Sequence, residues 1–287
     1  MNTSKRVNNL KTEIIKELPL LPNTRETKHE IESKDLSEIL IHYLHWKARL
    51  VPTRRRSVHI SPEITSDYRW KKFGPFIRKI LQKIRDGEDI NGYLSHKVHS
   101  DGYISTKKSE QQKHNSWEHK DQLLNTKGLY HLHMNPVPQK LGDPKRFNEL
   151  LLAHISREKF HAICISDHSV FANTDDNGEL SAERLRMWDI HKKHETQGMK
   201  PGTIYISHPI ASSGHPIYII EMARKYYSTI FEIDEMLDDR KFIENLYQQG
   251  NMDAPRKYNF QWKINDLDLC LYEKRAQIMF LIHSGHI

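Results

Sequence analysis

The chain has 287 residues, a formal net charge of +7 and a hydrophobic content of 37%. This length and composition suit one large globular domain or two smaller ones, and they exclude a largely disordered chain. No apolar run reaches the ~20 residues of a membrane-spanning helix, and the first residues lack the apolar core of a signal peptide. We therefore expect a cytoplasmic protein with no membrane partner. The two cysteines, Cys164 and Cys270, form no disulfide framework or CxxC pair and are expected to be buried in strands.

The N-terminal part, residues 1–115, is expected to be helical and basic. Ser37 can cap a helix that ends before Pro52, and a second helix is predicted over residues 66–85. The apolar side chains of that second helix recur at spacings of three and four, which marks a buried face. Pro75 is expected to bend it or to mark its true first turn, and Asp86-Gly87 to end it.

Basic side chains concentrate between Val51 and Arg85, a segment with ten Lys and Arg but only two acidic residues. The charges in the rest of the chain nearly cancel. A local basic surface of this kind suits a nucleic-acid backbone, although a solvated helix face that binds nothing is the alternative. The residues assigned to nucleic-acid binding are Arg54, Arg55, Arg56, Lys71, Lys72, Arg78, Lys79 and Lys83.

Three apolar runs in mid-chain, residues 129–134, 148–155 and 160–166, predict an antiparallel meander. Alternate side chains of a strand share a face, so His131 and His133 should point the same way. Arg146 precedes the second run and His168 follows the third, which can bring all four to one patch.

The remainder is expected to alternate helices and strands. Ser181 can cap a helix to about His194, residues 203–207 form a short strand, and a helix covers residues 217–227. Ser212, Ser213 and Gly214 precede this last helix and are candidates for phosphate binding. Asp234 is expected to cap a helix over residues 235–247, and three strands are predicted at 258–264, 267–272 and 276–283. Residues 116–287 would thus form an α+β domain built on an antiparallel sheet, with packed helices.

Imidazoles beside a guanidinium can cleave a phosphodiester without a metal. In this hypothesis His131 and His133 are general base and transition-state donor, Arg146 binds the phosphate bidentately, and His168 is the general acid. Two alternatives remain open for the same residues. His-x-His is also half of a metal site, with Asp167 or His168 as third ligand, or the histidines simply pack. His154 and His161 are interpreted as core histidines.

The order of the meander resembles the core sheet of the RelE/ParE superfamily of bacterial toxins. The matching segments are Tyr130-His131-Leu132-His133, then Arg146 before the run 150–155, then the run 163–165 leading to His168-Ser169-Val170-Phe171. The resemblance covers about 45 residues and implies a toxin that cleaves mRNA, often at the ribosome, and is inhibited by an antitoxin. Three features depart from the family. The basic residues after the last strand are replaced by Asn173-Thr174-Asp175-Asp176, the loop before Arg146 is longer, and the chain is far longer.

The sequence therefore predicts a toxin-like, metal-independent endoribonuclease. Its expected partners are RNA, either free or on the ribosome, and a cognate antitoxin protein. No cofactor and no metal are expected, since the chain has no GxGxxG, P-loop, HExxH or GxSxG motif. The alternatives are a metal-dependent phosphodiesterase or nuclease that uses the His-x-His strand, and a nucleic-acid-binding protein without catalysis.

Overall fold

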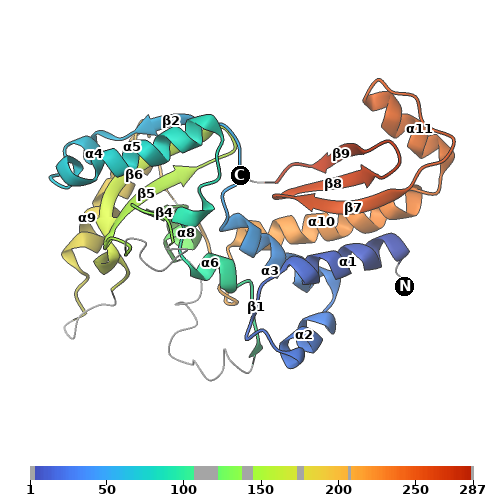
Figure 1. The fold of residues 1–287 in the computed structure, drawn as a ribbon, viewed down its shortest axis with the longest axis horizontal. Helices are drawn as coiled ribbons and strands as arrows, with labels where there is room; N and C mark the ends of the chain where they lie inside the picture. The colour runs from blue at the N-terminus through green and yellow to red at the C-terminus, as the bar shows by residue number, and fades with distance from the viewer. Residues whose placement is uncertain (1–3, 107–121, 138–144, 173–177, 206–207, 286–287) are drawn as a thin grey trace. The chain divides into compact units, whose positions relative to one another are not determined.

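The computed structural model describes residues 4–106, 122–137, 145–172, 178–205 and 208–285, and it has an α+β fold (Figure 1). Contacts divide the chain into two units. The first holds the described residues of 1–48, 100–113 and 217–286, and the second those of 49–99 and 114–216. This division differs from the border expected near residue 115, because the chain leaves the first unit after α3, re-enters it at residues 100–113 and returns to it again with α10. Neither unit is a continuous segment of the chain.

The first unit packs helices against a three-stranded antiparallel sheet of order β7-β8-β9. Its elements are α1 (Lys5–Glu17), β1 (Leu20–Leu21), α2 (Arg25–Glu32), α3 (Leu36–Ala48), β3 (Tyr103–Ile104), α10 (Ile217–Met236), α11 (Arg240–Gln249), β7 (Phe260–Asn265), β8 (Asp268–Glu273) and β9 (Ile278–His283). The three C-terminal strands confirm the sequence prediction.

Asp234 does not cap a helix, as the sequence suggested, but lies buried within α10. Its carboxylate accepts hydrogen bonds from Nε of Arg6 and Nε1 of Trp262, each at 2.9 Å. The next helix, α11, is capped by Asp239, whose side chain accepts from the N–H of Lys241. A buried Asp with two donors is satisfied inside a helix, so the helix runs on past it.

The second unit is a four-stranded mixed sheet of order β2-β6-β5-β4. The meander β4-β5-β6 is antiparallel as predicted, and β2 is added parallel to β6. The elements of this unit are β2 (Ser57–Ile60), α4 (Pro62–Thr65), α5 (Trp70–Asp86), η1 (Asn91–Tyr93), α6 (Lys97–Ser100), α8 (Gln122–Lys127), β4 (Tyr130–His133), β5 (Glu149–Ile155), β6 (Lys159–Asp167), η2 (His168–Phe171) and α9 (Ala182–Glu195).

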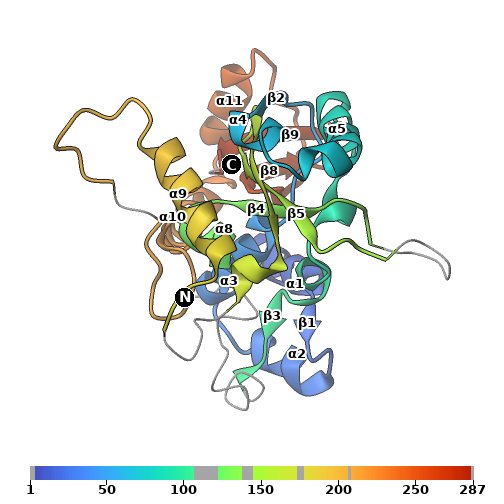
Figure 2. The same ribbon diagram turned by 90° about the vertical axis from the view of Figure 1, so that its left-hand side faces the viewer.

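Helices α5 and α9 cover opposite faces of this sheet (Figure 2). The α5 face buries the apolar side of that helix against alternate strand residues such as Tyr130, Leu132 and Leu151. The α9 face is built on Leu150 and Leu152. Because side chains alternate along a strand, His131 and His133 must lie on the α9 face, opposite the basic helix.

Helix α5 begins and ends close to its predicted limits. Pro75 lies inside the helix, past its first turn, so α5 lacks the hydrogen bond that a backbone N–H at this position would donate to the carbonyl of Lys71. Gly87 ends it with φ 75°, and a Cβ there would lie 2.9 Å from the backbone N of Arg55. A left-handed residue this close to another backbone segment needs glycine.

Two further expectations are settled by the described residues. The strand expected at residues 203–207 is not formed over 203–205, and residues 206–207 lie outside the described part. Among the described helices, none combines the length and apolar character needed to cross a bilayer.

Candidate functional site

Three of the predicted site histidines come together on the α9 face of the second unit's sheet. His131 and His133 pair with Leu152 and Leu150 of β5, and His168 opens η2 directly after β6. The ring centroids of His131 and His133 lie 6.2 Å apart, and those of His133 and His168 lie 5.2 Å apart. The strand order therefore gathers the imidazoles as the sequence predicted.

His133 is the buried member of this cluster, with 6% of its surface exposed. Burial, and then the charge of Arg146, lower its pKa to about 3. A ring with this pKa stays neutral near neutral pH. His133 can therefore donate or accept a hydrogen bond in a reaction, but it cannot serve as a cationic acid.

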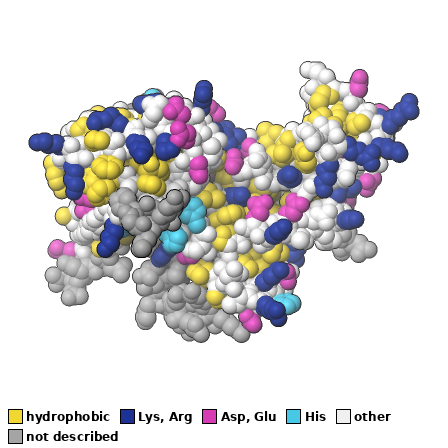
Figure 3. All heavy atoms as spheres, in the orientation of Figure 1, with side chains coloured by type: hydrophobic (Ala, Val, Ile, Leu, Met, Phe, Trp, Pro, Cys, Tyr) yellow, Lys and Arg dark blue, Asp and Glu magenta, His cyan; other side chains and the backbone are white. Residues whose placement is uncertain are grey.

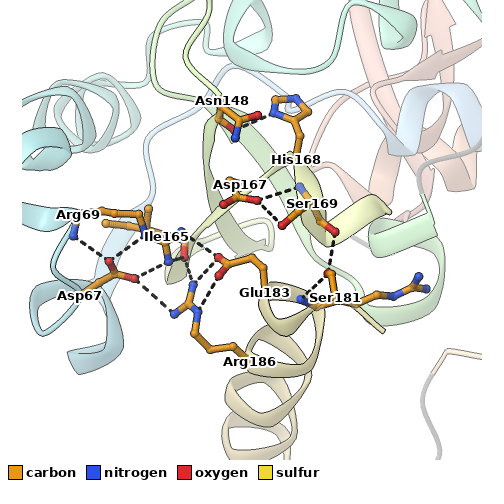
Figure 4. Close-up of polar contacts among 11 residues, drawn as sticks. Asp67, Arg69, Asn148, Ile165, Asp167, His168, Ser169, Ser181, Glu183 and Arg186 are labelled. Carbon is orange, nitrogen blue, oxygen red and sulfur yellow. Dashed lines mark hydrogen bonds and ion pairs between the residues drawn. The ribbon is translucent and has the colours of Figure 1, made fainter. Parts of the chain in front are cut away.

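His168 is exposed, and its tautomer is fixed by the backbone. Its Nδ1 lies 2.7 Å from the carbonyl oxygen of Asn148 (Figure 4). A carbonyl only accepts, so Nδ1 carries the proton and Nε2 of the neutral ring has a lone pair. This arrangement suits a general base more directly than the general acid expected from sequence.

Arg146 lies near the cluster but does not present a bidentate fork. Its Nη2 donates to the carbonyl oxygens of Gly92 and Leu94, at 2.9 and 2.8 Å, and its Nε is buried. Burial also lowers its pKa. With these donors occupied or enclosed, Arg146 supplies positive charge beside His133 and anchors the segment around η1. The bidentate phosphate contact expected from sequence is not available in this conformation.

An aromatic pocket of about 300 Å³ adjoins the cluster and was missed by sequence reasoning. Phe171 lines it, and its ring lies 5.1 Å from that of His131. Trp188 of α9 also lines it, and the cations of Lys127 and Arg184 lie over this ring at 5.6 and 5.5 Å from its centroid. Aromatic rings beside cations are the usual surroundings of a stacked nucleobase.

The basic surface is formed by α5 and the segment before β2, although not by all the residues assigned to it (Figure 3). Arg56 is buried, and its guanidinium donates to the carbonyl oxygens of Ser156, Pro52 and Arg54, so it does not belong to the surface. Lys83 forms an ion pair with Glu88. The exposed members are Arg55, Lys71, Lys72, Arg78 and Lys79, and Arg54 is half-buried.

Another arginine of this basic segment, Arg69, is structural. It is 7% exposed and forms ion pairs with Asp67 at 2.7 Å and with Glu183 of α9 at 2.9 Å (Figure 4). Arg186 joins both carboxylates, and both arginines donate to the carbonyl oxygen of Ile165. This buried network ties α9 to β6, and so it positions the helix over the histidine face.

The candidate phosphate loop Ser212-Ser213-Gly214 folds into a turn that uses its own amides. The N–H of Gly214 donates to the carbonyl of Ala211 at 2.8 Å, and the side chains of Ser213 and His215 are 3.1 Å apart. The cradle of free N–H groups expected before the helix is therefore not formed by Gly214.

A second group of histidines lies at the other end of the same sheet face. His154, which the sequence suggested was a core residue, is half-buried, and burial lowers its pKa to about 4. His191 and Glu195, one turn apart on α9, offer ligand atoms that together with one of His154 lie within 4.8 Å of one another. The signal in the sequence was His191-Lys-Lys-His194-Glu195, with His and Glu at a spacing of four.

Among the described residues, His154, His191 and Glu195 are close enough to bind one metal ion. The alternative set of His131, His133 and Asp167 is not. The carboxylate of Asp167 instead accepts from the N–H and the hydroxyl of Ser169 (Figure 4).

Comparison with known proteins does not extend these observations. No protein-family model matches the chain, and no curated protein or solved structure gives a significant match.

Proposed function

We propose that the protein is a toxin-like endoribonuclease that cleaves RNA without a metal ion. One observation carries this proposal: residues 146–148 connect the imidazole cluster to the basic helix. The charge of Arg146 helps to lower the pKa of His133, and the carbonyl of Asn148 orients His168. The ring centroids of Phe147 and of Phe73 on α5 lie 5.3 Å apart.

The cluster has the groups that cleavage through the ribose 2′-hydroxyl requires. Nε2 of His168 takes the proton from the 2′-hydroxyl, whose oxygen then attacks the phosphorus. The 5′-oxygen leaves with a proton from protonated His131, so that the products are a 2′,3′-cyclic phosphate and a 5′-hydroxyl. Neutral His133 donates a hydrogen bond, and Arg146 offsets the charge that develops on the phosphate.

The surroundings give a single-stranded RNA two further contacts. A base next to the scissile phosphate can enter the pocket lined by Phe171 and Trp188. The backbone can then pass Phe147, where Nζ of Lys72 lies 5.8 Å from the ring centroid, to the exposed cations of α5. Binding that rests on these cations should weaken steeply as salt increases.

The decisive experiment measures RNA cleavage in EDTA by wild type, His168→Ala, His131→Ala and the control His29→Ala, whose side chain is 86% exposed in the first unit. We expect losses of about 100-fold or more in the two site variants and none in the control. The same sequence made as DNA should not be cleaved, because it has no 2′-hydroxyl. Equal activity in wild type and site variants would refute the assignment.

Two other readings predict different results. A metal-dependent nuclease would lose activity in EDTA and regain it with added metal. A nucleic-acid-binding protein without catalysis would show salt-sensitive binding and no turnover. The toxin-like role adds that expression of wild type, but not of His168→Ala, arrests growth, and that a cognate antitoxin relieves the arrest.

A further inference from the structure

The second histidine group combines side chains from three strands and one helix of the second unit. His59, His161 and His154 are direct register neighbours across β2, β6 and β5, so their side chains share the α9 face. Above them, His191 and His194 of α9 lie with ring centroids 5.8 and 5.4 Å from that of His154. This group is separate from the cluster at His131, His133 and His168.

Two of these histidines, His154 and His191, have the spacing of a metal site together with Glu195 of α9. Nε2 of His154 is 3.2 Å from Oε1 of Glu195, and Nε2 of His191 is 3.9 Å from the same oxygen. A tetrahedral zinc ion with bonds of about 2.0–2.1 Å holds its ligand atoms about 3.3 Å apart. The separation of His154 and Glu195 is already close to this value, and all three separations are within 4.8 Å, so small side-chain movements complete the geometry.

The hydrogen bonds of His154 leave its Nε2 facing the carboxylate with a lone pair. Nδ1 lies 3.0 Å from the carbonyl oxygen of Gly128, which only accepts, so Nδ1 carries the proton of the neutral ring. Nε2 is buried and has no hydrogen-bond partner among the described residues. Two electron-rich atoms at this distance are favourable with either a proton or a metal ion between them, and a metal-ligating histidine typically donates its other N–H to a backbone carbonyl in this way.

A metal ion at this site must replace a hydrogen bond that His191 already makes. Nε2 of His191 now lies 3.1 Å from the carbonyl oxygen of Lys127, and it must exchange this hydrogen bond for a metal bond. His154 and Glu195 are already in contact, so His191 is the ligand that moves.

We propose that His154, His191 and Glu195 bind a divalent transition-metal ion, with Zn²⁺ as the best match. Two imidazoles and one carboxylate form the ligand set of zinc sites that keep a fourth position open. The proposal is independent of the metal-free nuclease assigned to the other end of the sheet, since it concerns different side chains and a different readout.

The test uses the full chain, stripped with EDTA and dialysed, and titrated with ZnCl₂ by calorimetry and with Co²⁺ by visible absorption. We expect one saturable site with the Co²⁺ spectrum of tetrahedral coordination. His154→Ala and Glu195→Gln should weaken Zn²⁺ binding by about 100-fold. The matched control is Asp189→Asn, an exposed acid on the same helix.

Glu195→Gln keeps the size of a half-buried side chain, so it reports on binding even if His154→Ala fails to fold. Circular dichroism of each variant establishes its fold. A Zn²⁺ affinity that is the same in wild type and in Glu195→Gln would overturn the proposal, as would the absence of saturable binding. The pair of His154 and Glu195 would then be bridged by a proton alone.

Discussion

The buried ion pairs of Arg69 allow a quantitative prediction about the second unit. Arg69→Met removes a guanidinium that donates to both oxygens of Asp67, to Glu183 and to the carbonyl of Ile165. The side chain of Asp67 is 3% exposed, so the substitution leaves a buried carboxylate without its main partner. Breaking such a pair costs about 3–5 kcal/mol. Arg186 stays 3.4 Å from Asp67, which places the expected loss near the lower limit, at ~3 kcal/mol.

Urea unfolding followed by circular dichroism measures this loss, with Arg85→Met, an exposed arginine on α5, as the control expected to change stability by less than ~0.5 kcal/mol. The pH dependence gives a second readout. Burial alone would raise the pKa of Asp67, but the hydrogen bonds from Arg69 outweigh it, and the pKa is lowered. Without Arg69 the carboxyl accepts a proton readily, so the deficit of the variant should shrink as pH falls toward ~4. A loss below ~1 kcal/mol at pH 7 would refute this reasoning.

Two further predictions concern the same unit. Because the pKa of His133 is lowered to about 3 in the folded protein, wild type should lose stability as pH falls from ~6.5, where the unfolded chain begins to bind the proton. His133→Gln should flatten this dependence in urea titrations at pH 7 and pH 5, and an unchanged slope would contradict the assignment. Gly87→Ala should cost ~1–2 kcal/mol, and more than Gly198→Ala in thermal unfolding. Both glycines have positive φ, but only at Gly87 does the added Cβ meet backbone, so equal losses would exclude the steric contribution.

Local patterns predicted elements that the sequence marks by periodicity or by turns, and failed where pairing is remote. Helix α5 could be predicted because it buries one face of its own pattern, and the three C-terminal strands because each is a short run of strand-forming residues bounded by turn residues. Strand β2 could not, because its residues are mostly exposed and its partner β6 lies about 100 residues away. Asp234 has the chemistry of a cap, but Arg6 and Trp262 satisfy it inside α10. No local rule identifies partners at such a distance.

The same distinction holds for the candidate site. The period of a strand placed His131 and His133 on one face, and the meander order brought His168 beside them. The fate of each arginine was not predictable, because Arg56 and Arg146 end on backbone carbonyls supplied by other segments. Charge counting treats such a buried arginine and an exposed one alike. His154 was interpreted as a core residue because the helix that brings His191 and Glu195 to it lies more than thirty residues further on.

Both histidine groups lie on one face of one sheet, and the apolar layer between them decides how they can interact. Leu150, Leu152 and Met187 are fully buried there. The register partners of the two leucines on β6, Ser166 and Cys164, are buried beside them. We expect a metal at His154 to act on the His131 end through the packing of β5, β6 and α9. Added zinc should therefore raise the melting temperature of the protein. In a separate assay, removal of the metal with EDTA should leave RNA cleavage unchanged, so each histidine group can be tested without disturbing the other.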